Sequence, residues 1–347
     1  MVTGQSRKKH IITIVSLLLI ALLSVGSVHS QEPGKLLGPT EVVIPDWFKT
    51  SFLDFRDDAE EASDENRHLL IYFHIHGCPY CQKMLDDNFR SDENSAFIQA
   101  SFDSIELNMH GSREVVFDEN NTLTESHLVK ALEVRFTPTI LFMDAHNRIV
   151  MRVNGYRSPR EFKHVLNYVK EKAYLHTKFT DYRDAHLTDA VYTLKDHPIY
   201  QDSQDLKQLV DTNKPVAILF EDSQCDACAD FHKTVFGIDT IQRVLSEYTV
   251  VRLDAKSKNL IIDDLGNRVT PGEWLTRLEI SYRPALLLFN EGKHRETSAG
   301  LLKSFHFEQL LSYVAGRHYD KFTSWSQYMT HRLEQLLESG ETVDVWK

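Results

Sequence analysis

Four cysteines form two close pairs in the sequence, and this spacing could support redox chemistry. Two residues separate the members of each pair, Cys78 with Cys81 and Cys225 with Cys228. A first thiol can attack a disulfide, and a second thiol one helical turn later can resolve the mixed disulfide that results. The pairs therefore predict dithiol–disulfide exchange. They are too few to form the disulfide scaffold of a chain of 347 residues.

The first pair has the better setting for a reactive thiolate. Pro79 follows Cys78 and suits the first position of a helix, because its φ is preset and no N–H is lost there. The free amides and partial positive charge of a helix N-terminus lower the pKa of a cysteine. We therefore expect Cys78 to attack and Cys81 to resolve. We expect His76, two residues before Cys78, to be a solvated loop residue.

The second pair has a less favourable setting. No proline separates Cys225 from Cys228, and the acids Glu221, Asp222 and Asp226 stand close by in the sequence. Nearby negative charge opposes the formation of a thiolate. The pair is therefore interpreted either as a second redox centre or as a vestigial pair that docks a partner.

Two other uses of the cysteines are less compatible with the sequence. Zinc needs four ligands and each pair supplies two, while His74 and His76 could complete a site only with awkward strand geometry. A structural disulfide across two intervening residues would close almost no loop and would stabilise little. We therefore expect neither a metal nor another cofactor.

The chain contains an internal repeat that accounts for the two cysteine pairs. Cys78 and Cys225 are 147 positions apart. Other segments match at nearly the same offset: Leu132-Glu133 with Leu278-Glu279, Pro138 with Pro284, and Gly155 with Gly300. A unit of this length is a domain rather than a solenoid repeat. We predict a tandem duplication, with domain 1 at residues 31–195 and domain 2 at residues 196–347.

Each copy presents strands and helices in the same order. Short apolar runs rich in β-forming residues are the predicted strands: 69–73, 102–107 and 139–143 in the first copy, and 216–220, 248–253 and 285–289 in the second. Predicted helices start at each cysteine pair, after Thr124 and Thr270, and near Pro159 and Phe305. This alternation predicts an α/β fold with helices on both faces of a mostly parallel sheet, which a hairpin partner makes mixed.

A proline precedes the third predicted strand of each copy. Thr137-Pro138 and Arg283-Pro284 occupy equivalent places. Proline is unfavourable inside a central strand, so at its start it indicates a turn, and we expect both bonds to be cis. Such a bend would leave the preceding backbone free to hold an extended peptide. Thr137, Pro138, Arg283 and Pro284 are therefore the candidate substrate-binding residues.

The first thirty residues have the pattern of an export signal. Basic residues at 7–9 precede an apolar run at 11–28, and small residues lead up to Ser30. We expect cleavage near Ser30 and a periplasmic or otherwise exported protein, with an uncleaved anchor as the alternative. Disulfides persist in such a compartment. The net charge of −11 gives no electrostatic case for binding nucleic acid.

These features together resemble the thioredoxin superfamily, in which a strand leads into a Cys-x-x-Cys and a proline opens a later strand. Residues 71–81, 136–139 and 155–156 look like exported thioredoxin-related proteins of the SoxW and DsbD-γ type. The resemblance covers about 45–175 strongly and about 205–318 with weaker motifs. It implies two tandem thioredoxin-like domains. It also implies that Cys78 attacks, Cys81 resolves and Pro138 contacts substrate, with Cys225, Cys228 and Pro284 as their counterparts.

The chain departs from the family pattern at several positions. The usual Trp before the first cysteine is replaced by Gly77 and by Gln224. The buried acid that cytosolic thioredoxins carry six residues before the nucleophile is replaced by Tyr72 and Leu219. Arg283 stands where the family usually has Thr, Ile or Val, which suggests different, acidic partners for domain 2.

The sequence therefore predicts an exported thiol–disulfide oxidoreductase that reduces protein disulfides and is recharged by a membrane electron donor. An oxidase or isomerase would use the same residues, because direction depends on reduction potential. A redox-inert adaptor that docks partners through the Pro138 and Pro284 grooves is the alternative from another class. The apolar stripe of the tail at 321–347 is expected to pack on domain 2, with a dimer contact as its alternative. The oligomeric state stays open.

Overall fold

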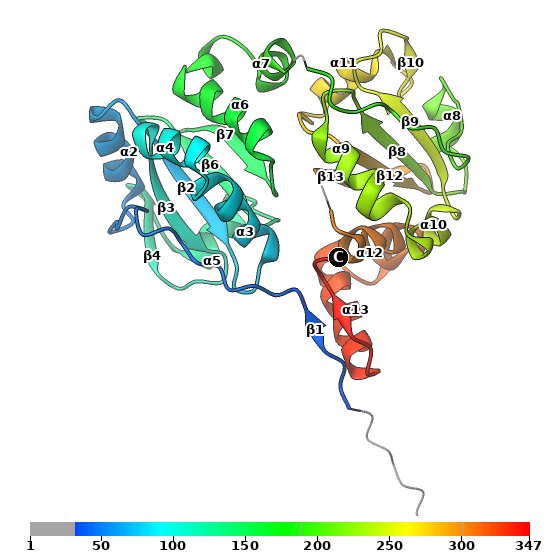
Figure 1. Cartoon of the computed structure of the whole chain (residues 1–347), viewed down its shortest axis with the longest axis horizontal. Coiled ribbons are helices and arrows are strands. Elements are labelled where there is room, and N and C mark those ends of the chain that lie inside the picture. The colour runs from blue at the N-terminus through cyan, green and yellow to red at the C-terminus, as the bar shows by residue number, and fades with distance from the viewer. Residues whose placement is uncertain (1–31, 188, 301) are drawn as a thin grey trace, which may run out of the picture.

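The computed structural model describes residues 32–187, 189–300 and 302–347, so the predicted export signal lies outside the described residues. Two α/β units follow one another along the chain and lie side by side (Figure 1). Each contains a four-stranded sheet with helices on both faces. None of the helices in the described part of the chain is long and apolar enough to span a bilayer.

The two central sheets have the same topology. Their strands, in spatial order, are β3 (Phe102–Asn108), β2 (His68–His74), β6 (Thr139–Met143) and β7 (Ile149–Asn154) in domain 1, and β9 (Thr249–Asp254), β8 (Val216–Glu221), β12 (Ala285–Asn290) and β13 (Lys293–Ala299) in domain 2. Within the described residues, each sheet has one parallel pair, β2 with β3 and β8 with β9.

The predicted mixed sheet is confirmed, but the expectation that it would be mostly parallel was wrong. The chain enters β6 at the edge of the sheet where β2 ends, so Thr139 pairs with Phe73 and the two strands run antiparallel. Ala285 and Phe220 form the equivalent pair in domain 2. This reversal places each proline-led strand directly beside the strand that leads into the cysteines.

Helices cover both faces of each sheet. In domain 1, α3 (Pro79–Met84), α4 (Asp92–Ser101) and α6 (Pro159–Lys170) pack on one face, and α2 (Phe55–Asp64) and α5 (Glu125–Ala131) pack on the other. In domain 2, α9 (Asp226–Phe231), α10 (Asp239–Leu245), α12 (Ser304–Ala315) and α13 (Trp325–Glu338) lie opposite α8 (Leu206–Val210) and α11 (Pro271–Arg277). A further helix, α7 (Phe179–His186), follows α6.

Strand β2 shows why the apolar runs form central strands. Leu70 and Tyr72 face the cluster beneath α3 and α6, while Leu69, Ile71 and Phe73 face the cluster beneath α2 and α5. All five are fully buried. A strand covered by helices on both faces needs apolar residues at every position, which is why this run does not alternate with polar residues.

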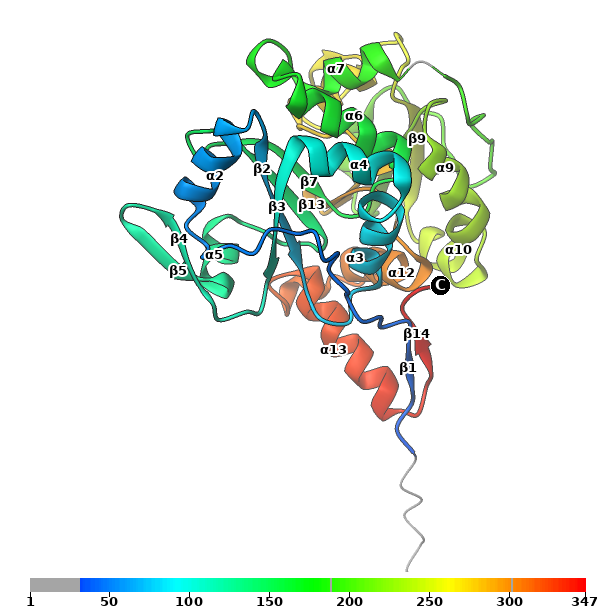
Figure 2. The same cartoon turned by 60° about the vertical axis from the view of Figure 1, so that its left-hand side comes forward.

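The chain returns to its own beginning at the tail of domain 2. Strand β1 (Leu36–Leu37) pairs in parallel with β14 (Val343–Asp344), and Figure 2 shows the two beside each other next to α13. Trp325 and Tyr328 of α13 pack into the core of domain 2, which confirms the expected packing of the tail. The domain limits at 31–195 and 196–347 stay predictions, and residues 36–37 contact domain 2 rather than domain 1.

Candidate active site

In domain 1, the strand–helix junction positions the first cysteine as predicted. Cys78 comes after the short turn 75–77 that follows β2 and is the N-cap of α3, with its Sγ accepting a hydrogen bond from the backbone N–H of Cys81 at 3.1 Å. The two cysteines are joined as a disulfide. Cys81 is fully buried, and Cys78 exposes 5% of its surface. A sulfur in this position receives the amide hydrogen bond and the partial positive charge that stabilise a thiolate.

The fold brings the proline turn to the cysteine, although the two lie far apart in the sequence. The Thr137-Pro138 bond is cis, as expected, and Thr137 Oγ1 lies 3.5 Å from Cys78 Sγ. Phe136, the residue before this pair, exposes 37% of its surface. Domain 1 therefore combines the Cys78 sulfur, a cis-proline turn and an exposed aromatic side chain at one edge of its sheet.

The surroundings of Cys78 contain two further details. His76 is exposed, as expected of a loop residue. Tyr72 Oη donates a hydrogen bond of 2.8 Å to the backbone carbonyl of Cys81, so the residue that replaces the family's buried acid ties β2 to α3. Sequence reasoning noted Tyr72 only as a departure. The hydrogen bond could not be predicted, because it depends on how β2 packs against α3.

In domain 2, the same scaffold carries a second disulfide between Cys225 and Cys228. Cys225 is the N-cap of α9 and its Sγ accepts a hydrogen bond from the N–H of Cys228 at 2.8 Å. The Arg283-Pro284 bond is cis. Both cysteines are fully buried, and Arg283 reaches the same region through its contact with Asp222.

Two of the acids near the second pair, Glu221 and Asp222, have partners that sequence reasoning missed. Glu221 Oε1 lies 2.8 Å from His232 Nε2, and both side chains are buried. Asp222, also fully buried, lies 3.5 Å from Arg283 Nε and 3.7 Å from an Arg183 nitrogen. His232 could have been found, since it follows Cys228 by one helical turn. Arg183 could not, because it comes from α7 of the other domain.

Arg283 does not form the open acidic-partner site that its charge suggested. Its side chain is buried and is directed at Asp222 of its own domain. Burial and the neighbouring Arg183 lower the pKa of Arg283 to about 10. The position that holds a small hydroxyl beside the sulfur in domain 1 thus holds a buried ionic contact in domain 2.

A buried carboxyl group lies on domain 1 close to the second site. Burial and the nearby Asp226 raise the pKa of Glu161 in α6 from 4.5 to about 7, against the opposing effect of Arg157 and Arg183. Asp226 lies directly after Cys225 in the sequence, so α6 of domain 1 faces the start of α9. The electrostatics of the second pair therefore depend on residues of both domains.

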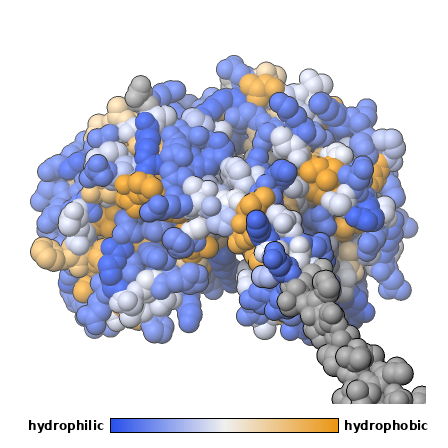
Figure 3. Space-filling view, turned by 60° about the horizontal axis from the view of Figure 1, so that its bottom comes forward, coloured by the Kyte–Doolittle hydropathy of each residue, from blue (hydrophilic) through white to orange (hydrophobic). Residues whose placement is uncertain are grey.

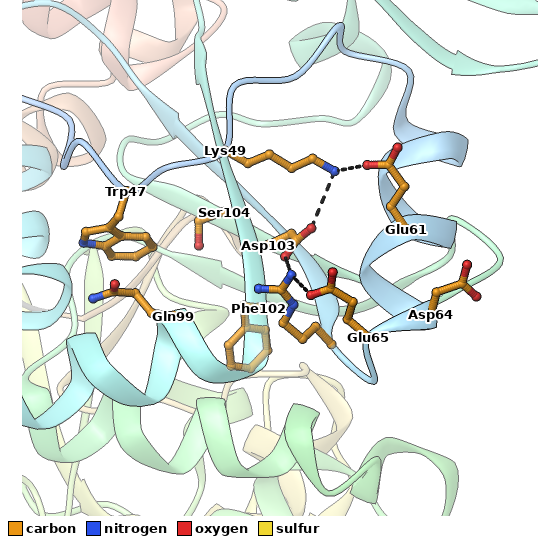
Figure 4. A pocket seen from close by; sticks show the side chains of 10 residues that line it. Trp47, Lys49, Glu61, Asp64, Glu65, Gln99, Phe102, Asp103 and Ser104 are labelled. Carbon is orange, nitrogen blue, oxygen red and sulfur yellow. Dashed lines mark hydrogen bonds and ion pairs between the residues drawn. The ribbon is translucent and has the colours of Figure 1, made fainter.

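The described residues also include a cavity that none of the cysteines lines. It has a volume of about 550 Å³ and opens beside the start of β3, where Lys49 points toward Glu61 and Asp103 (Figure 4). Figure 3 shows one face of the molecule as mainly hydrophilic, with hydrophobic side chains in separate small patches. Within the described residues, no group of three or more His, Cys, Asp and Glu side chains is placed to hold a metal ion.

The fold and the two cysteine sites define a class of protein with paired α/β redox domains. A model of the thioredoxin-like domain matches residues 55–170 and 203–315, which is more than half of the chain. The chain therefore belongs to the thioredoxin-like domain family and contains that domain twice. Thioredoxin-like domains with such cysteine pairs are consistent with a thiol–disulfide oxidoreductase.

Three similar solved structures each cover between 31% and 39% of this chain. A thioredoxin-fold protein from Helicobacter pylori is 23% identical, covering 39% of this chain and 92% of its own, with a TM-score of 0.32. A thioredoxin from Thermus thermophilus is 25% identical, covering 33% and 83%, with a TM-score of 0.26. The DsbD C-terminal domain of Neisseria meningitidis is 15% identical, covering 31% and 93%, with a TM-score of 0.24. No curated protein matches the chain.

Proposed function

We propose that the chain is an exported thiol–disulfide oxidoreductase that reduces protein disulfides through Cys78 and Cys81. The observation that carries the proposal is the geometry of domain 1, where the Cys78 sulfur caps α3 and lies 3.5 Å from Thr137 Oγ1 beside a cis-proline. The exposed Phe136 supplies an apolar surface next to this turn. An extended peptide with a disulfide is the substrate class that suits such an edge.

The reaction uses the two sulfurs in sequence. The Cys78 thiolate attacks one sulfur of the substrate disulfide, forms a mixed disulfide and releases the first substrate thiol. The Cys81 thiolate then attacks Cys78 Sγ, which releases the second substrate thiol and leaves the Cys78–Cys81 disulfide. Two electrons and two protons pass to the substrate. The disulfide of the structure is the product form, and a dithiol donor, proposed to be membrane-bound, must reduce it again.

The direction and the location belong to the same proposal. The resemblance to exported proteins of the SoxW and DsbD-γ type and the signal-like residues 1–30 support an exported reductase. Running in reverse, the same sulfurs would oxidise dithiols, and a long-lived mixed disulfide would allow isomerisation. The measured reduction potential of the Cys78–Cys81 couple against that of its compartment decides the direction.

A second role is favoured for domain 2 by a separate observation. Cys225 and Cys228 are fully buried, and Arg283 is held by Asp222 rather than exposed beside Pro284. We propose that domain 2 acts mainly as a docking module. An adaptor function for the whole chain would require the same inertness of Cys78, which lies beside the small Thr137 hydroxyl and the exposed Phe136 rather than beside a buried ionic contact.

Reduction of insulin by the full chain, with dithiothreitol as the donor, tests this proposal. The wild type should reduce insulin, Cys78→Ser should not, and the matched double variant Cys225→Ser/Cys228→Ser should retain most of the rate. A Cys81→Ala variant should accumulate a mixed disulfide that identifies the substrate by mass spectrometry. Unchanged reduction by Cys78→Ser would remove the catalytic assignment.

A further inference from the structure

We propose that the two domains cover each other's cysteine pair, and that this closed form is a resting state which must open before a protein disulfide reaches either pair. The inference rests on the proposed function and concerns the regulation of the same site. It follows from the position of the cysteines at the contact between the domains and from the nature of the groups buried there.

Domain 2 covers the first site through Tyr80, which lies between Cys78 and Cys81. Tyr80 Oη accepts a hydrogen bond of 2.8 Å from the backbone N–H of Lys303 and lies 3.4 Å from His306 Nδ1. The Trp346 ring lies 5.0 Å from the Tyr80 ring, nearly perpendicular to it. Burial lowers the pKa of His306 to about 4. The helix that carries the attacking sulfur is thus held against the start of α12 and the end of the chain.

Domain 1 covers the second site at the turn before Pro284. The Arg157 guanidinium lies 3.3 Å from the centre of the Tyr282 ring, and the Phe179 ring lies 6.0 Å from it. Arg160 donates a hydrogen bond of 3.0 Å to the carbonyl of Gln224, the residue before Cys225. Domain 1 therefore occupies the peptide-binding edge of domain 2.

The segment between the domains completes this cover. Tyr192 packs directly on Cys225 and Cys228. The backbone N–H groups of Val191 and Tyr192 both donate to the carbonyl of Ser223, at 2.8 and 3.0 Å. The second disulfide consequently has protein on the side from which a substrate would approach.

The burial of the sulfurs is incompatible with direct attack on a protein disulfide in the closed form. Cys78 exposes 5% of its surface and Cys225 none. Exchange requires the attacking sulfur to meet a substrate sulfur within bonding distance, and access is one of the factors that sets its rate. A folded or extended protein substrate cannot make that approach while Tyr80 is held by Lys303 and His306. Movement of one domain relative to the other is the simplest change that exposes both pairs.

The contact between the domains contains groups that gain from opening. Glu161 Oε1, Asp222 Oδ2 and Arg183 Nη2 are buried without a hydrogen-bond partner among the described residues. Buried charged groups that lack full hydrogen bonding are costly, and water would satisfy them once the domains part. The contact between the domains therefore combines aromatic packing at Tyr80 and Tyr282 with buried polar groups that are incompletely hydrogen-bonded.

The opening of the full chain can be tested with a double variant and a matched control. Arg157→Ala/Arg160→Ala removes two contacts of domain 1 with domain 2 and leaves all four cysteines and both cis-proline turns in place. Lys163→Ala is the control, because Lys163 is also in α6 but its Nζ lies 4.1 Å from the Phe97 ring within domain 1. A second opening variant, Trp346→Ala, removes the cover of Tyr80 from the side of domain 2.

Three measurements on these proteins decide the proposal. They are the rate of iodoacetamide labelling at Cys78 and Cys225 in the reduced chain, the radius of gyration by small-angle X-ray scattering, and the rate of insulin reduction. We expect labelling at Cys225 to rise at least about 10-fold in the double variant, since a 10-fold change in population needs the loss of only about one charged hydrogen bond. The radius and the insulin rate should rise with it, and Lys163→Ala should match the wild type.

The outcomes separate this inference from the proposed function. Labelling of both cysteines in the wild type as fast as in an unfolded peptide would overturn the closed resting state. A second result would also overturn it. In that case both opening variants would have the labelling rate, radius of gyration and insulin rate of the wild type, while circular dichroism shows that they are folded. Faster labelling without insulin reduction by any of the proteins would support the cover and remove the reductase function instead.

Discussion

The two cysteine sites share one scaffold and differ in the residues that surround the sulfur. In domain 1, Thr137 lies beside Cys78, and Phe136 is partly exposed. At the equivalent positions of domain 2, Arg283 is bound to Asp222, and Tyr282 is buried against Arg157. The helix cap, the disulfide and the cis-proline are the same in both.

This difference shows that two copies of one scaffold can have the same backbone features while the side chains before the cis-proline make different contacts. The backbone features depend on the strand–helix junction and are retained because the fold needs them. The side chains at the binding edge are free to change, and in domain 2 they hold domain 1. The same edge that suits a substrate in one copy is an internal contact in the other.

The largest contrast is expected from the cysteines themselves. Cys78→Ser should lower insulin reduction by at least about 100-fold, because the proposed nucleophile of the domain 1 site is lost. Cys225→Ser/Cys228→Ser should change the rate by no more than about 3-fold, because this pair is not rate-determining if it only docks. Equal losses in the two variants would show that both copies take part in turnover and would remove the distinction.

The next effect concerns the charge that domain 2 has acquired. Arg283→Thr, which installs the domain 1 residue, leaves Asp222 buried with Arg183 as its remaining partner. We expect a loss of about 3 kcal/mol in the free energy of unfolding, measured by urea titration, because a buried charge is left under-compensated. Arg135→Ala is the control, since its pair with Glu133 is solvent-exposed and should be worth about 1 kcal/mol or less. If the free energy of unfolding of Arg283→Thr differed from that of the wild type by less than the experimental error, Asp222 would be hydrated or protonated.

The aromatic residues before the two turns give a similar contrast. Tyr282→Ala should destabilise the chain by about 3 kcal/mol, because a fully enclosed ring is removed from the contact between the domains. Phe136→Ala should cost about 0.5 kcal/mol or less, because its ring is partly in solvent. It should instead raise the KM for insulin. The reverse order of stabilities would show that Phe136, and not Tyr282, carries the packing.

The smallest expected effect is the pH dependence contributed by Glu161. Its pKa is about 7 in the closed form and 4.5 in water, so the closed form binds more protons between these values. The contribution of Glu161 is therefore fully present below pH 4.5, falls as the pH rises, and is lost above about pH 7. In the wild type, the rate of Cys225 labelling should rise with pH between pH 4.5 and about 7, and Glu161→Gln should make this rise smaller. An unchanged rise in the variant would mean that another group causes the pH dependence.

Much of the fold could be predicted from the sequence because it depends on local signals. The apolar runs that become β2 and β8, the proline after Cys78 and the matching offset of the two copies are visible without a structure. The cysteines and the cis-prolines were identified for the same reason. The direction of β6 relative to β2 was not predicted correctly, because it depends on the path of the chain between β3 and Pro138.

The contacts of the second site could not be predicted, because they join residues of different domains. Arg183 and Arg157 look like ordinary surface cations in the sequence, and only the packing of α6 and α7 against domain 2 gives them partners. From the sequence alone, the acids near Cys225 therefore look like isolated charges. In the structure, Glu221 and Asp222 have cationic or imidazole partners, so the expected opposition to a thiolate is reduced.

The pairing of β1 with β14 gives the molecule a second connection between its halves, held by backbone hydrogen bonds rather than by the covalent chain. Domain 1 is connected to domain 2 through the segment after α7, and also through residues 38–54, whose beginning is held at the tail of domain 2. Two tethers of this kind keep separated domains at a high effective concentration, so that parting is a hinged movement and reclosure is fast. Removal of residues 32–37 would leave one tether and should prolong each opening without altering either cysteine site.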